Sequence, residues 1–522
     1  MGLNALDLLI IIVYLAGITV FGLRFRKRQR SLRDYFLADR NIPWWAISLS
    51  IVAAETSTLT IISVPGLAFA TNFAFLQLVF GYIVGRIIIS FVLLPHYFQG
   101  NLFTAYELIQ RRFGPRLHSL TAGLFLITRA AAEGVRVFAV AIVVGIALSA
   151  VLSGMSDLGR DLAAIAIVTV LTLIYTFEGG MTAVIWTDVV QTAIYVSGTL
   201  IGFVTILHSV PGGWHTVSSL ASASGKFRVF DFSWSFFTTY TFWSGLIGGA
   251  FLTFATHGTD QLIVQRLLAA RGLRQSQVAL IASGILVAVL FALFLTVGSM
   301  LFAFYHQFPP IASFGKTDRI FPTFIVTQMP HGISGLLIAA ILAAAMSNLS
   351  AALNSLSSSS IVDFYARRHP EASEQTRVRL SRVATVIWGL ILFVLAILSR
   401  RGGRVVEVGL SIAAVSFGAL LGVFMLGVLT KRANERGTMI GMLVGFLTSV
   451  YLWQGRNVLD WLQTVTSLHW TALALPRAIP FTWWFMIGSL VTFFVGYVAS
   501  VLLRSNHNSS EPAPIHAEHV HP

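Results

Sequence analysis

The sequence predicts an all-α integral membrane protein with about 13 membrane-spanning helices in one domain. Of its 522 residues, 56% are hydrophobic and only 11% are charged, and the mean hydropathy is +0.79. A soluble domain carries about 25% charged residues, so this composition excludes one. Apolar runs long enough to cross a bilayer also recur along the whole chain. In order, they are 4–23, 43–70, 73–98, 119–152, 160–177, 183–208, 237–263, 276–304, 333–361, 380–399, 405–430, 437–454 and 481–503.

Several classes of protein are excluded by composition and motif. The chain has no cysteine, which rules out disulfides, thiolate metal sites and a cysteine nucleophile. It has no HExxH or GxSxG motif, so we do not expect an enzyme. The net charge of +14 falls mostly in short loops between apolar runs, where basic residues set orientation. No nucleic-acid partner is therefore expected, and the lipid bilayer is the expected surrounding.

The basic residues also predict the topology. The first apolar run is followed by Arg24, Arg26, Lys27, Arg28 and Arg30, whereas a secretory signal carries its charges before the run. We therefore expect a retained span, an outside N-terminus and, after an odd number of spans, a cytoplasmic C-terminus. The inside loops then hold roughly twice as many Arg and Lys as the outside loops. The expected location is the plasma membrane (the inner membrane of a bacterium), with one domain over 1–504 and a disordered cytoplasmic tail over 505–522.

The second apolar run, 43–70, carries a polar centre. Glu55 is followed by the hydroxyls of Thr56, Ser57, Thr58 and Thr60. A charge at mid-bilayer costs roughly 2.5 kcal/mol or more, so it is tolerated mainly beside a polar cavity or an ion. One interpretation is a buried Glu that is hydrogen-bonded within the bundle. The other, which we favour, is half of a solute and cation site in an interrupted helix.

Two later runs are polar in the same way. The run 237–263 combines four glycines, at 245, 248, 249 and 258, with Thr253, Thr256, His257 and Asp260, and predicts a second interrupted helix. Such glycines alone would equally indicate close helix packing. In the run 333–361, Ala344, Ser347 and Asn348 share one helix face, and their oxygens suit a hard cation. Serine can instead bond back to its own helix.

The fourth run contains the only dense set of charges inside a span. Arg129, Glu133 and Arg136 are four and three residues apart, so they can form one ion-pair ladder. We favour a structural role; the alternative is that one arginine binds an anionic substrate through its planar guanidinium. Arg86, in the third run, is expected to snorkel toward the cytoplasmic end.

The two interrupted runs are five spans apart, which divides most of the chain into two units. Runs two to six and seven to eleven each contain five helices, so the second unit must cross the membrane in the inverted sense. The units cover about 43–208 and about 237–430. Broken helices at matching places in two halves are the best sequence pointer to a transporter site.

Four separated motifs resemble the sodium:solute symporter family, in the same order. They are DYFLADR at 34–40, YTFEGGMTAVIWTDVVQ at 175–191, HGTDQ at 257–261, and the stretch 343–363. The resemblance runs from about residue 5 to 430. It implies a LeuT-like core of five-plus-five inverted repeats. It also implies sodium-driven symport of an organic solute or small anion by alternating access.

By position, the resemblance implies a sodium site. The ligands would be the backbone carbonyls of Ala53, Thr56 and Ala344 and the side-chain oxygens of Ser347 and Asn348. Asn348 departs from the family, whose members usually have Ser or Thr there. An amide oxygen can bind the ion but reaches further, so the geometry of the site should differ.

The solute pocket is expected between the two breaks. We would line it with Glu55, Ser57, Thr60, Thr253, Thr256 and His257. Galactose transporters of the family have glutamine, asparagine, tyrosine and tryptophan at the last four positions, which argues against a hexose. A monocarboxylate, an amino acid or a vitamin-like solute is favoured.

Two alternatives to sodium symport have sequence support. Proton coupling is possible because Glu55, Asp260 and His257 could carry the proton. A membrane sensor built on a transporter-like core is less favoured, because it normally needs a cytoplasmic output domain and the tail after Arg504 is short.

Overall fold

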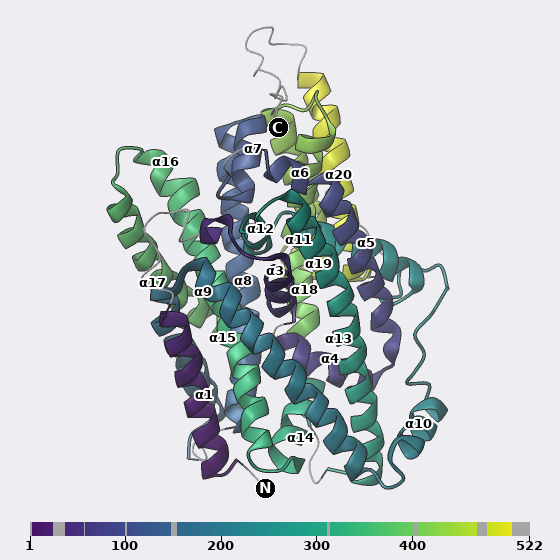
Figure 1. Cartoon of the computed structure of the whole chain (residues 1–522). Coiled ribbons are helices and arrows are strands. Elements are labelled where there is room, and N and C mark those ends of the chain that lie inside the picture. The colour runs from purple at the N-terminus through teal and green to yellow at the C-terminus, as the bar shows by residue number, and fades with distance from the viewer. Residues whose placement is uncertain are drawn as a thin grey trace.

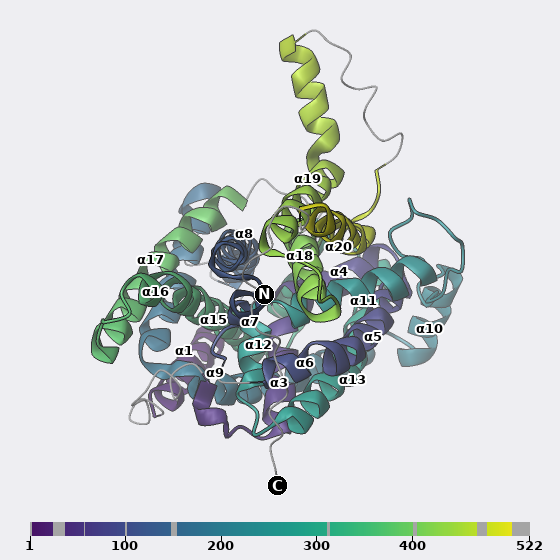
Figure 2. The same cartoon turned by 90° about the horizontal axis from the view of Figure 1, so that it is seen from above.

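The computed structural model describes residues 3–24, 37–56, 58–99, 102–147, 154–310, 314–399, 405–466 and 478–503. Ser57 and the tail predicted over 505–522 lie outside this part. The described residues form an all-helical bundle without strands, with one isolated bridge between Ile42 and Ala270. Figure 1 shows the long helices running side by side, and Figure 2 shows α19 extending outward from the bundle.

The main helices, in chain order, are α1 (Ala5–Leu23), α3 (Trp44–Glu55), α4 (Thr58–Ala70), α5 (Leu76–Val92), α6 (Leu94–Tyr97), α7 (Ala105–Phe113), α8 (Pro115–Ala147), α9 (Asp157–Ser209), α10 (Gly213–Ala223), the π-helix η4 (Ser244–Gly248), α11 (Gly249–Gly258), α12 (Gln261–Leu268), α13 (Leu273–Gln307), α14 (Ile320–Gln328), α15 (Ile333–Ser359), the π-helix η6 (Ser360–Tyr365), α16 (Ala366–Arg368), α17 (Glu374–Leu398), α18 (Val405–Leu429), α19 (Glu435–Thr466) and α20 (Phe481–Leu503). Short 3-10 helices are η2 (Ala38–Arg40), η3 (Phe73–Phe75) and η5 (Thr317–Arg319).

The length and apolar character of these helices fit a membrane protein, but the count of 13 spans is not confirmed. Among the described residues, 9 helices could each cross a bilayer, and the bent pair α3 and α4 makes a tenth. The other three predicted runs are occupied by α1, by the first part of α9 and by η4, α11 and α12. α9 has 53 residues, and a straight helix of that length would measure about 80 Å, so it cannot be one straight crossing.

The outer surface of the bundle is apolar. Ile127, Leu390, Leu398 and Leu502 are each more than 60% exposed, and they lie on α8, α17 and α20. Side chains of this kind on several helices would be unfavourable in water and are expected at a lipid-facing surface. The interior, in contrast, contains most of the charged residues of the spans, including Arg86, Arg129 and Glu133.

Close helix packing positions the second broken helix. Gly81 and Gly85 of α5 face η4 and α11, and a Cβ added at Gly81 would lie 2.4 Å from the carbonyl oxygen of Gly245. A Cβ at Gly249 would lie 2.3 Å from the carbonyl oxygen of Leu78. These glycines therefore act as packing residues, which was one of the two interpretations of the sequence. The helix is interrupted further along, at Thr259 and Asp260.

Candidate functional site

The first break lies where the sequence predicts it. α3 ends at Glu55, Thr56 adopts φ −82° and ψ 63°, and α4 begins at Thr58 with a bend of 61° between the two helices. A helix end leaves backbone carbonyls without their usual partners. Here the carbonyl of Glu55 accepts a hydrogen bond from Thr60 Oγ1 (3.2 Å), and Thr58 Oγ1 donates to the carbonyl of Ile341 in α15 (3.1 Å).

Three of the predicted sodium ligands meet beside this break. Asn348 Nδ2 donates to the carbonyl oxygens of Ala53 (3.2 Å) and Ala344 (3.4 Å), which joins the end of α3 to α15. Thr56 is fully buried next to them. The side chain of Ser347 lies outside the described part of the structure. The nitrogen of Asn348 faces the two carbonyls, whereas its oxygen is the predicted ligand.

The donor set at this point suits a small hard cation. Ala53 and Ala344 offer carbonyl oxygens, and the end of α3 carries the negative pole of the helix dipole. Asn348 is 3% exposed, and its Oδ1 has no hydrogen-bond partner among the described residues. Rotation of the Asn348 amide would bring its buried, unpaired Oδ1 to the carbonyl oxygens of Ala53 and Ala344. Three oxygens at one point would suit a sodium ion.

A buried charge cluster links the two broken helices. The guanidinium of Arg86 pairs with the Glu55 carboxylate, and its Nη2 lies 3.2 Å from Nε2 of His257. His257 Nε2 is also 3.5 Å from Glu55 Oε2, and its Nδ1 is 3.1 Å from Thr256 Oγ1. Since Thr256 Oγ1 donates to the carbonyl of Leu252, it accepts from Nδ1–H, which leaves Nε2 free to accept from Arg86.

Arg86 does not snorkel, so that prediction is wrong. Its side chain is 0% exposed, because Glu55 from α3 supplies an opposite charge inside the bundle. The partner comes from another helix, and the position of Arg86 along its own run does not reveal it.

The second break is stabilised by side chains from three other helices. Tyr97 and Tyr106 donate their hydroxyl hydrogens to the carbonyls of Gly258 (2.5 Å) and Thr259 (3.1 Å). Asp260 begins α12: its Oδ1 accepts from the backbone N–H of Leu262 (2.9 Å), and its Oδ2 pairs with Arg129 Nη1 of α8 (2.8 Å). The backbone groups freed by the break thus find partners inside the protein, as a membrane requires.

The predicted ion-pair ladder in α8 is confirmed. Glu133 Oε1 lies 2.5 Å from Arg129 Nη2 and 2.8 Å from Arg136 Nη1. The two arginines differ in their surroundings. Arg129 is 5% exposed and also pairs with Asp260, whereas Arg136 is 28% exposed and contacts Glu133 alone among the described acidic residues.

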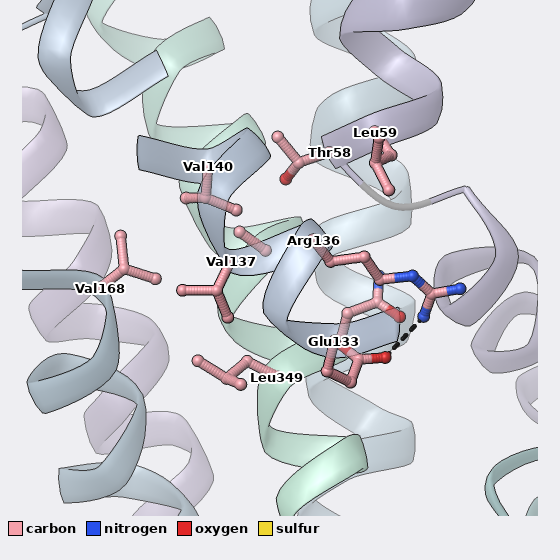
Figure 3. Close-up of a pocket in the computed structure, with 10 residues that line it drawn as sticks. Thr58, Leu59, Glu133, Arg136, Val137, Val140, Val168 and Leu349 are labelled. Atoms are coloured by element: carbon pink, nitrogen blue, oxygen red, sulfur yellow. Dashed lines mark hydrogen bonds and ion pairs between the residues drawn. The ribbon is translucent and has the colours of Figure 1, made fainter. Parts of the chain in front are cut away.

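A small pocket opens beside this ladder (Figure 3). Arg136 and Glu133 lie side by side in it, and Thr58 and Asn348 connect it to the first break and to the candidate sodium site. Its apolar lining consists of Leu59, Val137, Val140, Val168, Ala345 and Leu349. Apolar walls with a few charged and polar groups are typical of small-molecule sites.

None of the five described residues of the predicted solute pocket lines this cavity. Glu55 and His257 belong to the charge cluster with Arg86, and Thr60 bonds to the backbone at the first break. Thr253 is fully buried against α5, and Thr256 bonds within α11. The sixth, Ser57, is not described. Arg86, Tyr97 and Tyr106 were missed as site residues because none of them carries a recognisable motif.

Comparison with known proteins agrees with this architecture. The family model of the sodium:solute symporter family matches residues 35–445. The sodium/sialic acid symporter NanT of Aliivibrio fischeri is 30% identical over 97% of this chain and 95% of its own length. The sodium/sialic acid symporter SiaT of Proteus mirabilis is 31% identical over 83% and 86%. Sodium-coupled monocarboxylate transporter 2 of Bos taurus is 26% identical over 84% of this chain and 70% of its own length.

Solved structures show the same fold. A Na⁺-coupled sialic acid symporter in a substrate-bound outward-open state superposes with a TM-score of 0.80 at 27% identity, covering 96% of this chain and 98% of the other. A nucleobase-cation-symport-1 family transporter gives a TM-score of 0.58 at 11% identity over 90% and 94%, which shows likeness of fold alone.

Two broken helices that meet inside an all-helical bundle, together with the match to solved symporter structures, define a secondary active transporter of LeuT-like fold. It is a multi-pass membrane protein and not an enzyme. The chain belongs to the sodium:solute symporter family. It is accordingly a sodium-coupled symporter of a small organic solute, as the sequence analysis expected.

Proposed function

We propose that the solute is a small organic acid and that Arg136 binds its carboxylate. The observation that carries this proposal is the partly exposed guanidinium of Arg136 inside the pocket, 2.8 Å from Glu133 and with further N–H groups to offer. A guanidinium matches a carboxylate with two parallel hydrogen bonds. The names of the relatives support an acidic solute, since they include sialic acid and monocarboxylate transporters.

The sodium site that we propose consists of the carbonyls of Ala53, Thr56 and Ala344 with Ser347 and Asn348. It adjoins the pocket because Asn348 belongs to both. Sodium at this point would bridge the end of α3 and α15 and fix one wall of the pocket. Solute affinity should then rise with sodium, which is the coupling that symport requires.

We also propose that Glu55, Ser57, Thr60, Thr253, Thr256 and His257 shape the solute site from the side of the two breaks. Glu55 and His257 would act by holding the breaks together through Arg86, as their contacts suggest. Since Glu55 and Asp260 are each paired with an arginine, sodium is favoured over a proton as the coupling ion.

The proposed organisation follows the sequence analysis. One domain over 1–504 would contain inverted repeats over about 43–208 and about 237–430, which rock between outward-open and inward-open states. The expected location is a bacterial inner membrane with the N-terminus outside and the C-terminus in the cytoplasm.

The proposal is tested by ligand-dependent thermal stabilisation of the purified protein and an Arg136→Ala variant. Sialic acid and a panel of monocarboxylates are titrated at fixed sodium. We expect at least one acid to stabilise the wild type, and the variant to bind it at least about tenfold more weakly because the solute carboxylate loses its guanidinium partner. Sodium alone should stabilise both proteins.

The matched control is Arg228→Ala, whose side chain is 63% exposed in a loop and lies 3.6 Å from Asp231. It should bind the acid like the wild type. Binding of an acid that is unchanged by Arg136→Ala would refute the assignment of Arg136. Stabilisation by neutral solutes alone would refute the acidic solute.

A further inference from the structure

The contacts of Asn348 show a polar group in an unexpected orientation. The carbonyl of Ala53 lies in the last turn of α3, which ends at Glu55. Asn348 Nδ2 lies 3.2 Å from this oxygen and 3.4 Å from that of Ala344. The partial positive charge of the amide therefore points at the place where two carbonyl oxygens converge.

The opposite side of the same amide is left unsatisfied. Oδ1 of Asn348 is buried and has no hydrogen-bond partner among the described residues, and the side chain as a whole is 3% exposed. Exchanging the two amide atoms would place three oxygens against one another, which is repulsive without a cation between them. With a cation present the exchange becomes favourable, since Oδ1 then becomes a ligand.

We propose that the Asn348 carboxamide takes the place of sodium when the ion is absent. Its Nδ2–H₂ group bridges Ala53 and Ala344, and sodium binding turns the amide over so that Oδ1 replaces Nδ2. This rests on the proposed sodium site and adds a function to it. Asn348 is then both a competitor and a ligand, and it sets the sodium concentration at which the site fills.

Two consequences follow from the competition. The contact between the end of α3 and α15 persists without sodium, because the amide maintains it. Sodium affinity is also lower than it would be with a hydroxyl at this position, since the ion must first break two hydrogen bonds. The substitution Asn348→Ser retains a ligand oxygen, but its shorter side chain cannot bridge both carbonyls in the same way.

The experiment is a sodium titration followed by thermal unfolding, with choline keeping the ionic strength constant and no solute present. The proteins are the wild type, Asn348→Ser and Asn348→Thr. We expect both variants to be less stable than the wild type without sodium. They should reach half-maximal stabilisation at several-fold to about tenfold lower sodium, the effect expected when two weak hydrogen bonds no longer compete.

The matched control is Asn354→Ser. This residue lies on the same helix, is equally buried, and has no hydrogen bond to α3 in the described structure. It should leave the half-saturating sodium concentration unchanged. Hydrogen exchange of the peptide over 50–60 in sodium-free buffer gives a second measurement, and it should be faster in Asn348→Ser than in the wild type.

The outcomes separate the two proposals. If sodium does not stabilise the wild type, the proposed sodium site fails. If sodium stabilises the wild type but the variants at 348 bind it equally or more weakly, the site stands and the competing amide is refuted. Protection of 50–60 that is unchanged in Asn348→Ser without sodium would also refute it.

Discussion

At the scale of single residues, the structure depends on charges that neutralise one another away from water. Arg86 is 0% exposed at its side chain, Glu55 is 13% exposed and His257 is 6% exposed. Arg86 lies on α5, Glu55 on α3 and His257 on α11. Such a cluster adds little net stability compared with an apolar core, but removing one member leaves a charge buried without a partner.

Glu55→Gln should therefore destabilise the protein by about 3 kcal/mol, because Arg86 keeps its charge and loses its carboxylate. The unfolding free energy in mild detergent measures this. The double variant Glu55→Gln, Arg86→Met should recover part of the loss, since no uncompensated charge remains. Glu371→Gln, at an exposed Glu, is the control and should change stability by less than about 0.5 kcal/mol. A single variant as stable as the wild type would contradict a structural role for the pair.

At the scale of helices, the first break was predictable and the details of the second were not. Glu55 with its hydroxyl neighbours inside an apolar run has few interpretations, and the helix is interrupted there. The glycines of the seventh run had two interpretations, packing or interruption, and only the neighbouring helix decides between them. The break itself depends on Asp260 as a helix cap and on Tyr97 and Tyr106, which come from elsewhere in the chain.

Pairing between helices limits prediction in the same way. Local spacing sufficed for Arg129, Glu133 and Arg136, since all three lie on one helix. It did not reveal that Arg129 also pairs with Asp260, nor that Arg86 pairs with Glu55. A single sequence gives the spacing between two residues of the same helix. It does not show how helices pack, so it does not reveal which residues of different helices form a pair.

The contact between α5 and η4 gives a test at this scale. Gly81→Ala would place a methyl group 2.4 Å from the carbonyl oxygen of Gly245 and 2.7 Å from that of Leu246. Backbone atoms cannot rotate aside, so the helices must separate, which should cost about 1–3 kcal/mol. The melting temperature should fall accordingly, and solute affinity should weaken because α11 moves with η4.

The matched control is Gly145→Ala in α8, where an added Cβ meets no heavy atom within 4 Å. Alanine is the better helix former by about 1 kcal/mol, so this variant should be as stable as the wild type or slightly more stable. Equal melting temperatures for the variants at 81 and 145 would show that α5 and η4 are not in close contact.

At the scale of the whole molecule, the start of α7 connects the second broken helix to the segment that follows α15. The side chain of Gln261, in the second broken helix, bonds to the backbone of Ala105 (2.7 Å) and Phe103 (2.9 Å). Thr104 Oγ1 donates to Asp363 Oδ1 beyond the end of α15 (3.0 Å), and His118 Nε2 lies 2.9 Å from the same oxygen. The start of α7 is thus joined to the second break and to η6, and α8 contacts the same carboxylate of Asp363.

Glu107 makes the stability of this junction dependent on pH. Burial raises the pKa of its carboxyl from 4.5 to about 7, and the nearby charge of Asp363 adds to the rise. The folded protein therefore keeps a proton there that the unfolded chain has already released. Since the folded state binds more protons between about pH 4.5 and 7, stability should fall as the pH rises through this window, by at most about 3 kcal/mol.

Glu107→Gln keeps an acceptor for the N–H of Phe103 and carries no charge, so its melting temperature should lack this decline and exceed that of the wild type at pH 8. If the melting temperatures of the wild type and of Glu107→Gln changed in parallel from pH 5 to 8, Glu107 would not be the cause of the pH dependence.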